Sequence, residues 1–159
     1  MNSFRIRLLS VLIGLFLILP VASTFAKDRK AMNQAKAKII ETQKAPAAIG
    51  AYSQALEING TYYFSGQIGL DPVSMELKPT FEGQVDQILK NIDALLEACN
   101  LERSNIVKST IFLTDLAKFG AVNTAYTEYF KERFPARSCV EASNLPKGAL
   151  VEIEVIAHK

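Results

Sequence analysis

Two stretches of this chain have the apolar spacing of an amphipathic helix, whereas the other regular stretches have the composition of strands. The first helix carries apolar residues at intervals of three and four: Val85, Ile88, Leu89, Ile92, Leu95, Leu96 and Cys99. Thr80 is placed to cap its start and Asn100 to end it. The second helix is expected from Leu116 to Phe134, with a stripe typical of core packing: Phe119, Val122, Tyr126, Tyr129 and Phe130.

The strands are marked by β-branched and aromatic residues between turn signals. Asn59-Gly60 predicts a hairpin with arms Tyr52–Ile58 and Thr61–Ser65, because a type I′ turn needs positive φ at both central residues. Further strands are expected in "AKIIET", in "NIVKSTIFLTDL", at Ser138–Ala142 and at Leu150–Ala157. The order β-β-β-α-β-α-β-β predicts an α+β fold with a mixed sheet.

The two sides of the last strand differ in polarity. Val151, Ile153, Val155 and Ala157 form an apolar side, and the other side holds Glu152, Glu154 and Ile156. Two helices can cover one face of such a sheet, so the other face meets water or a partner. Its acidic and apolar groups favour a polar interface between subunits, and we expect an oligomer.

The N-terminus has the order of a secretory signal peptide. Arg5 and Arg7 precede an uncharged, largely apolar run that ends in small residues. We expect cleavage after Ala26, which divides the chain into a signal peptide (1–26), a leader (27–36) and one domain (37–159). Cleavage after Ala22 and a retained membrane anchor are the alternatives, since the uncharged run from Leu8 to Ala26 is about the length that spans a bilayer. The chain is therefore expected outside the cytoplasm, periplasmic or secreted and free of the membrane once cleaved.

Charge is unevenly distributed along the chain. Residues 27–44 carry six basic and two acidic residues, whereas residues 45–159 carry ten basic and fourteen acidic, a net charge of −4. A nucleic-acid surface needs clustered lysine and arginine on the folded domain. The composition therefore argues against a nucleic-acid partner.

Few residues could bind a metal or form a disulfide. Cys99 and Cys139 are the two cysteines, and His158 is the single histidine. Neither cysteine belongs to a metal-binding pattern, so no metal site is expected. A disulfide must be considered in an exported protein, but two buried free thiols are the favoured interpretation.

The candidate chemical groups are few. Arg137 follows Pro135 at the entry to a strand, and its planar fork suits a carboxylate; a salt bridge to a nearby glutamate is the alternative. Glu152 could polarise a water, or it could be a solvated strand residue. Cys139 has no histidine to activate it, so its backbone matters more than its sulfur. At Ser65-Gly66 the glycine permits close approach to the main chain.

Several longer motifs together resemble the RidA (YjgF-like) family. They are "APAAIGAYSQA", "FSGQIGLDP", "IVKSTIFLTDLAKFGAVNTAYTEYF" and "FPARSCVEASNLPKGALVEIEVIA", and the resemblance covers about residues 37–158. It implies a chorismate-mutase-like α+β unit with two helices on one face of the sheet. It also implies a homotrimer with sites in the clefts between subunits.

The resemblance further implies an enamine/imine deaminase. Such an enzyme hydrolyses 2-iminobutanoate, 2-iminopropanoate and related 2-imino or 2-enamino acids to 2-oxo acids and ammonia, without a cofactor. The carboxylate-binding arginine falls on Arg137, the glutamate beside the water on Glu152 and the cysteine on Cys139. The tyrosine that closes the cleft falls on Tyr52. The remaining substrate-binding positions are Ser65, Gly66 and Asn123.

Two departures from the family pattern stand out. Ala51 replaces the usual proline before the tyrosine, and the export signal is unusual among intracellular relatives. An exported member would draw its imine from an amino-acid oxidase or another source in the envelope. The alternatives are a non-catalytic small-carboxylate-binding trimer, or a ribonuclease-like or chaperone-like member of the same family. The charge of residues 45–159 and the lack of a histidine pair argue against the ribonuclease.

Overall fold

The computed structural model describes residues 36–159. The predicted signal peptide and almost all of the predicted leader lie outside the described residues. The described part contains a six-stranded sheet in the order β1-β2-β3-β6-β4-β5. All neighbours are antiparallel except β4 and β5. The strands are β1 (Lys38–Ile40), β2 (Ala55–Ile58), β3 (Thr61–Ile68), β4 (Ile106–Leu113), β5 (Ala136–Glu141) and β6 (Val151–His158).

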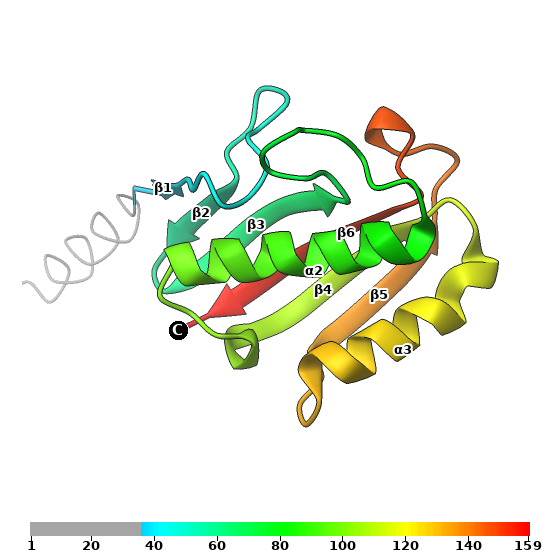
Figure 1. Cartoon of the computed structure of the whole chain (residues 1–159). Coiled ribbons are helices and arrows are strands. Elements are labelled where there is room, and N and C mark those ends of the chain that lie inside the picture. Colours follow the sequence, from blue (N-terminus) through cyan, green and yellow to red (C-terminus); the bar gives the residue numbers. More distant parts are fainter. Residues whose placement is uncertain (1–35) are drawn as a thin grey trace, which may run out of the picture. The chain divides into compact units, whose positions relative to one another are not determined.

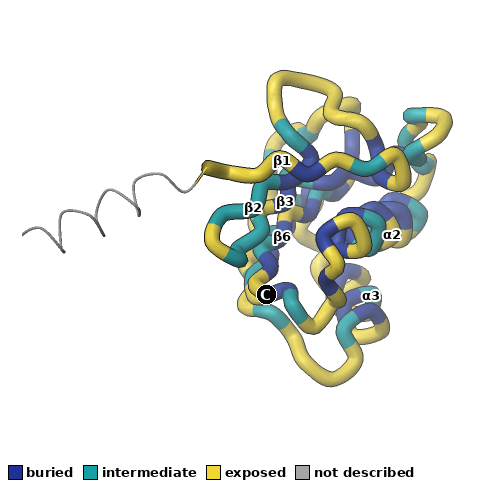
Figure 2. Tube along the Cα trace, turned by 90° about the vertical axis from the view of Figure 1, so that its left-hand side faces the viewer, coloured by how far each residue is buried: buried dark blue, intermediate teal, exposed yellow. Residues whose placement is uncertain are grey.

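Helices α2 (Phe81–Ala98) and α3 (Phe119–Phe130) lie on the same face of this sheet (Figures 1 and 2). The predicted α+β fold with two helices on one face is confirmed. Val151 and Ile153 of β6 are 0% exposed beneath the helices, whereas Glu152 between them points to the uncovered face. The two-residue alternation of β6 therefore separates a closed core from an open polar face.

Local signals fix α2 where the sequence predicted it. The Thr80 hydroxyl accepts a hydrogen bond from the Gly83 N–H at 3.1 Å, which satisfies one of the free donors of the first turn. The helix ends before Asn100, whose φ of 53° is the left-handed conformation that stops a helix.

The second helix is shorter than predicted. Leu116–Lys118 form a 3-10 turn, because the Asp115 carboxylate accepts from the Ala117 N–H at 2.9 Å and starts a tighter turn first. The α-helix ends at Phe130, where Lys131 takes a φ of 61°. Its predicted core stripe is only partly correct, because Phe119 is 40% exposed while Val122, Tyr126 and Tyr129 are buried.

Strand bounds also differ from the prediction. The Asn59-Gly60 turn is confirmed, with φ values of 53° and 78°. Tyr52 was predicted in the first arm of the hairpin but lies in the loop before β2. The second arm, β3, runs on to Ile68. The late start of β2 and the longer β3 both lie near a bulge in β3. Sequence periodicity alone cannot indicate such a bulge or the loop that packs beside it.

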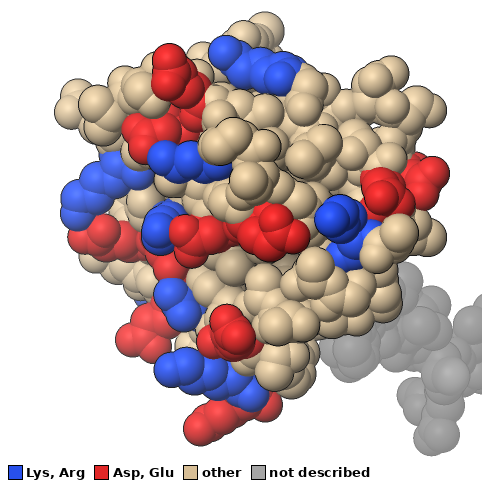
Figure 3. Space-filling model, turned by 45° about the vertical axis from the view of Figure 1, so that its right-hand side comes forward, with Lys and Arg blue, Asp and Glu red and all other residues tan. Residues whose placement is uncertain are grey.

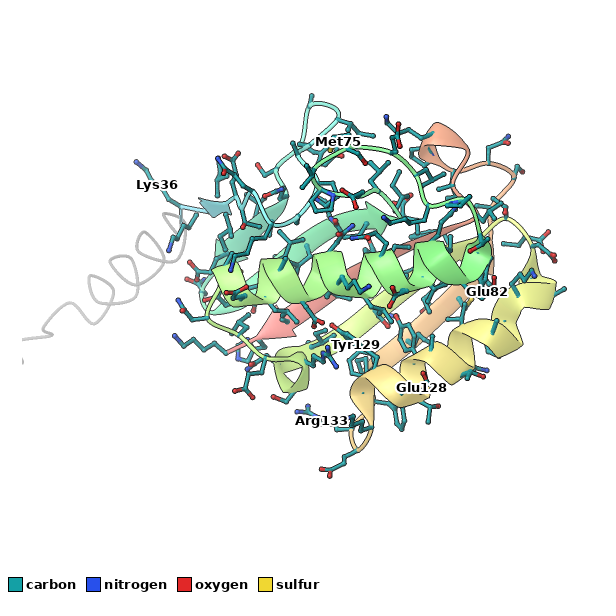
Figure 4. The ribbon with its side chains drawn as sticks, in the orientation of Figure 1. Lys36, Met75, Glu82, Glu128, Tyr129 and Arg133 are labelled. Atoms are coloured by element: carbon teal, nitrogen blue, oxygen red, sulfur yellow. The ribbon has the colours of Figure 1, made fainter. Side chains whose placement is uncertain are left out.

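The two helices are joined by a polar contact at their outer side. Tyr129 points from α3 toward α2 (Figure 4), and its hydroxyl donates to Asp93 Oδ1 at 2.7 Å. Arg103 donates to both oxygens of Asp93, at 2.9 and 2.6 Å, and its guanidinium lies 4.0 Å from the centre of the Tyr129 ring. This arginine is fully engaged in holding the helices.

Candidate functional site

Arg137 lies on edge strand β5, on the side of the sheet that α3 covers. Its Nη2 donates to Asn123 Oδ1 of α3 at 2.6 Å. Its guanidinium carbon lies 5.2 Å from the ring centres of both Phe119 and Tyr126. The expected alternative, a salt bridge to a nearby glutamate, is absent from residues 36–159. Arg137 is therefore held in place while its charge stays unpaired among residues 36–159.

A cavity of about 320 Å³ opens at this arginine. It is lined by Asn123, Tyr126, Thr127, Phe134, Pro135 and Arg137. A guanidinium with a free edge at the wall of a small cavity can hold a carboxylate by two parallel hydrogen bonds.

Cys139 follows two residues along β5 and faces the same side as Arg137. It is only partly buried, so the prediction of two buried thiols holds for Cys99 and is wrong for Cys139, which lies on an edge strand. Both are free cysteines. Burial raises the pKa of the Cys139 thiol, although the charge of Arg137 acts in the opposite direction. A thiol with a raised pKa is a poor nucleophile, in accord with a backbone role.

Glu152 lies on the uncovered face, directly over Gly66 of β3. A Cβ added at Gly66 would overlap the Glu152 Oε1 and lie 2.8 Å from its Cδ, so a glycine is required for this approach. Burial raises the pKa of the half-buried Glu152 carboxyl, and the nearby Glu154 charge raises it further. A carboxyl with a raised pKa holds a proton more readily, so it can both accept and return one.

Four predicted residues share one cavity of about 340 Å³: Tyr52, Ser65, Gly66 and Glu152. Ser65 and Gly66 form the bulge of β3, where two residues face one residue of β6. The Ser65 hydroxyl donates to the Ser53 carbonyl at 2.6 Å, which ties β3 to the loop that carries Tyr52. The Tyr52 hydroxyl accepts from the Ile49 N–H at 3.1 Å, and the residue is 46% exposed at the edge of the cavity.

Gln54 was missed by the sequence analysis, although it builds the wall of this cavity. Its side chain is 5% exposed, and its amide nitrogen donates to the carbonyls of Pro46 at 2.8 Å and Thr42 at 3.1 Å. Its amide oxygen accepts from the Thr42 N–H at 2.7 Å. One buried amide thus holds the loop 42–54 closed. The sequence offered little signal for this role, because Gln54 stands between Ser53 and Ala55 just before β2.

Polar residues of α2 hold the other side of the cavity. Gln84 accepts from the Leu150 N–H at 2.8 Å, just before β6, and Asn91 donates to the Leu70 carbonyl at 3.0 Å. Both side chains are buried on the face of α2 that meets the sheet. Amides at helical spacing on an otherwise apolar face were a signal for such loop contacts.

The two groups of predicted residues remain apart within one chain. Arg137 and Asn123 line one cavity on the α3 side of the sheet, and Glu152, which points to the uncovered face, lines another. The two cavities share no lining residue. We call the two groups half-sites: one can hold an anion, and the other can handle a proton and a water.

Neither half has the ligands of a metal site. Among residues 36–159, no three histidines, cysteines or acids are grouped so that they could hold a metal ion. Acidic and basic side chains are mixed over the face in Figure 3, without a basic patch. No helix of residues 36–159 has the length and apolar character to cross a bilayer.

The fold and these half-sites define a class: a small α+β domain with an anion-binding arginine at one edge of its sheet and a carboxyl on the open face. The family model described as endoribonuclease L-PSP matches residues 42–159. The chain therefore belongs to this family, which includes the RidA and RutC proteins, as the sequence motifs predicted.

Relatives of known name support this assignment. The chain is 48% identical over 121 residues to the 2-iminobutanoate/2-iminopropanoate deaminase of Rattus norvegicus, covering 76% of this chain and 88% of the relative. It resembles the Rid family protein YyfA from Yersinia pestis, with 52% identity and a TM-score of 0.76 over 78% of this chain and all of that one. It also resembles E. coli TdcF with bound serine, with 40% identity and a TM-score of 0.74 over 77% and 98% of the chains.

Proposed function

We propose that this protein is a 2-imino acid deaminase, a hydrolase that converts 2-iminobutanoate and 2-iminopropanoate to the 2-oxo acids and ammonia. The observation that carries the proposal is Arg137, which α3 holds beside a small cavity and which has no ion-pair partner in the described part of the chain. A carboxylate is the common feature of these imines. The deaminase relative and the serine bound to TdcF support a ligand of this kind.

The chemistry needs little beyond positioning. Arg137 holds the substrate carboxylate and so fixes the imine carbon next to it. A water oxygen adds to that carbon, the C=N π electrons move to nitrogen, and the nitrogen takes a proton. In the resulting carbinolamine the hydroxyl proton is transferred to the amino nitrogen as the C–N bond breaks, so that ammonia leaves and the oxygen keeps a double bond to carbon in the 2-oxo acid. An enamine substrate first takes a proton on carbon to become the imine.

Glu152 takes the role of proton carrier in this scheme. Its raised pKa suits a group that accepts a proton from the attacking water and returns it to the leaving nitrogen. The main chain at Ser65 and Gly66 lies beside the carboxyl and can hold the water. Tyr52 covers the cavity, and the Cys139 backbone contributes at the edge strand.

We further propose that the working enzyme is a homotrimer with its sites between subunits. The separation of the two half-sites in one chain supports this arrangement, because Arg137 of one copy can meet Glu152 of another. The uncovered sheet face offers the surface, with the half-buried Phe112 and Ile156 and the 48% exposed Tyr63 among its polar groups. A small imino acid and further copies of this chain are the partners.

We also propose export, with cleavage after Ala26, so that the enzyme meets imines formed outside the cytoplasm. The mass of the protein that accumulates from the full gene tests this. A mass equal to that of a chain beginning at Lys27 would support cleavage, whereas the intact 17.5 kDa chain in the membrane fraction would favour a retained anchor.

The activity is tested by making 2-iminobutanoate in the cuvette and measuring the release of 2-oxobutanoate. Arg137→Ala should lower kcat/KM about 100-fold, because hydrogen bonds to a charged group are each worth about 1.5–3 kcal/mol. Glu152→Gln should lower turnover but leave the binding of 2-oxobutanoate intact. A folded protein that binds 2-oxobutanoate through Arg137 and never accelerates hydrolysis would instead be a carboxylate-binding module.

Co-expression tests the shared site. If each site joins Arg137 of one subunit with Glu152 of the next, random trimers of Arg137→Ala and Glu152→Gln should recover about a quarter of the wild-type activity. Each variant alone is the control. If the site lies within one chain, the mixture stays as inactive as its parts.

A further inference from the structure

The two arginines that contact α3 are held in different ways. Arg103 and Arg137 each stack on aromatic rings of this helix, Arg103 on Tyr129 and Arg137 on Phe119 and Tyr126. Arg103 is oriented by a carboxylate, Asp93, which takes two hydrogen bonds and neutralises it. Arg137 is oriented by a neutral amide, Asn123. Both arginines are therefore held by aromatic stacking and a hydrogen-bond acceptor, but the acceptor is charged for Arg103 and uncharged for Arg137.

The neutral acceptor leaves the charge of Arg137 available. Asn123 Oδ1 accepts a hydrogen bond from Arg137 Nη2 at 2.6 Å, just below the usual range for a nitrogen donor and an oxygen acceptor. Among residues 36–159, no carboxylate lies within ion-pair distance of Arg137. A carboxylate at position 123 would have nearly the same shape, yet it would compete with any anion for the guanidinium.

The aromatic rings complete the orientation. The guanidinium carbon is equally distant, at 5.2 Å, from Phe119 and Tyr126, and Tyr126 is 3% exposed and fixed in the core. Burial raises the pKa of Tyr126 to about 12, so the ring stays uncharged and attracts the cation only through its face. With Asn123 holding one Nη2 proton, the remaining donors of the fork are left for the cavity.

We propose that Asn123 is a positioning residue whose amide orients Arg137 without neutralising it, rather than a residue that binds the substrate itself. This inference rests on the proposed function, since it takes the ligand of Arg137 to be the carboxylate of an imino or oxo acid. Asn123 sets the affinity for that carboxylate through its lack of charge. It sets the rate through the geometry that it gives to Arg137.

The test compares Asn123→Asp with Asn123→Ala in the full-length protein as it is expressed and purified. Binding of 2-oxobutanoate is measured by calorimetry, and KM and kcat are measured with 2-iminobutanoate. Asn123→Asp keeps the hydrogen bond and adds a charge, so Kd and KM should rise about tenfold or more with kcat within about twofold. Asn123→Ala frees the arginine, so kcat should fall about tenfold with a smaller rise in KM.

Thr124→Asp is the matched control, because Thr124 is the next residue on α3 and is exposed. It adds the same charge to the same helix without touching Arg137, and Kd should stay within about twofold of wild type because an exposed charge is screened. If Asn123→Asp fails to fold, Asn123→Gln and Asn123→Glu make the same comparison with longer side chains. The glutamate variant should then bind about tenfold more weakly than the glutamine variant.

The outcomes separate this inference from the proposed function. Wild-type affinity in Asn123→Asp, or in the glutamate variant relative to the glutamine variant, would overturn the need for a neutral acceptor. Wild-type kcat in Asn123→Ala would overturn the positioning role. A wild-type protein that binds no 2-oxobutanoate, or an Arg137→Ala variant that binds it normally, would remove the proposed function and this inference together.

Discussion

The covered and uncovered faces of the sheet differ in how far their side chains are buried. On the covered face, residues such as Ile111 of β4 are 0% exposed and are packed from all sides by α2, α3 and the neighbouring strands. On the uncovered face, the next residue, Phe112, is only partly buried, beside Glu152 of β6. One face is complete within the chain and supplies stability. The other is uncovered and holds half-buried apolar side chains beside acidic ones, and the proposed subunit interface would cover it.

The largest expected difference is between alanine variants of two adjacent residues of β4, Ile111 on the covered face and Phe112 on the uncovered face. Ile111→Ala leaves a cavity in a closed core and should lower the free energy of unfolding by about 2–5 kcal/mol. Phe112→Ala should act mainly on assembly, seen as a smaller species in size-exclusion chromatography at low concentration. Urea unfolding of both variants makes the comparison. Equal destabilisation by Phe112→Ala with unchanged assembly would mean that the second face is as complete as the first.

A second pair of variants adds a methyl group, once at Gly66 beside Glu152 and once at Gly120 in α3. Gly66→Ala forces the Glu152 carboxyl to move, because the new Cβ would overlap it. Turnover should fall about 10–100-fold, the cost of misplacing a reacting group by an ångström or so. Gly120→Ala in α3 is the control, since nothing lies within 4 Å of its Cβ position. It should stabilise the helix by up to about 1 kcal/mol with activity unchanged. Normal turnover in Gly66→Ala would separate Glu152 from the chemistry.

The smallest expected effect is the pH dependence of stability at Glu152. Its folded pKa is raised, mainly by burial, so the ionised form costs stability. The stability that the protonated form contributes is complete below the unfolded pKa of about 4.3 and is lost as the pH rises through the folded pKa. Glu152→Gln should therefore match wild type in melting temperature near pH 4 and exceed it at pH 7. A difference that does not vary with pH would contradict the raised pKa.

Local features were predictable from sequence, and features made by distant residues were not. Helix α2 and the Asn59-Gly60 turn depend on residues close in sequence, so periodicity and turn chemistry located both. The family motifs made Arg137 and Glu152 candidate site residues, whereas the helical periodicity indicated only a core position for Phe119. Its place over Arg137 depends on the parallel pairing of β4 and β5, which brings α3 against the edge strand. Gln54 was missed for the same reason, because its partners lie up to 12 residues away in an irregular loop.

The position of β6 has a consequence for how this chain is made. The last strand in the sequence is central in the sheet, where β3 and β4 flank it on either side. Until Val151–His158 are synthesised, no strand joins β3 to β4, and the residues that pack beneath α2 lack the core side chains of β6. Such contacts between distant segments form late. The sheet therefore stays unfinished until Val151–His158 have left the ribosome, and loss of this strand would leave no native sheet.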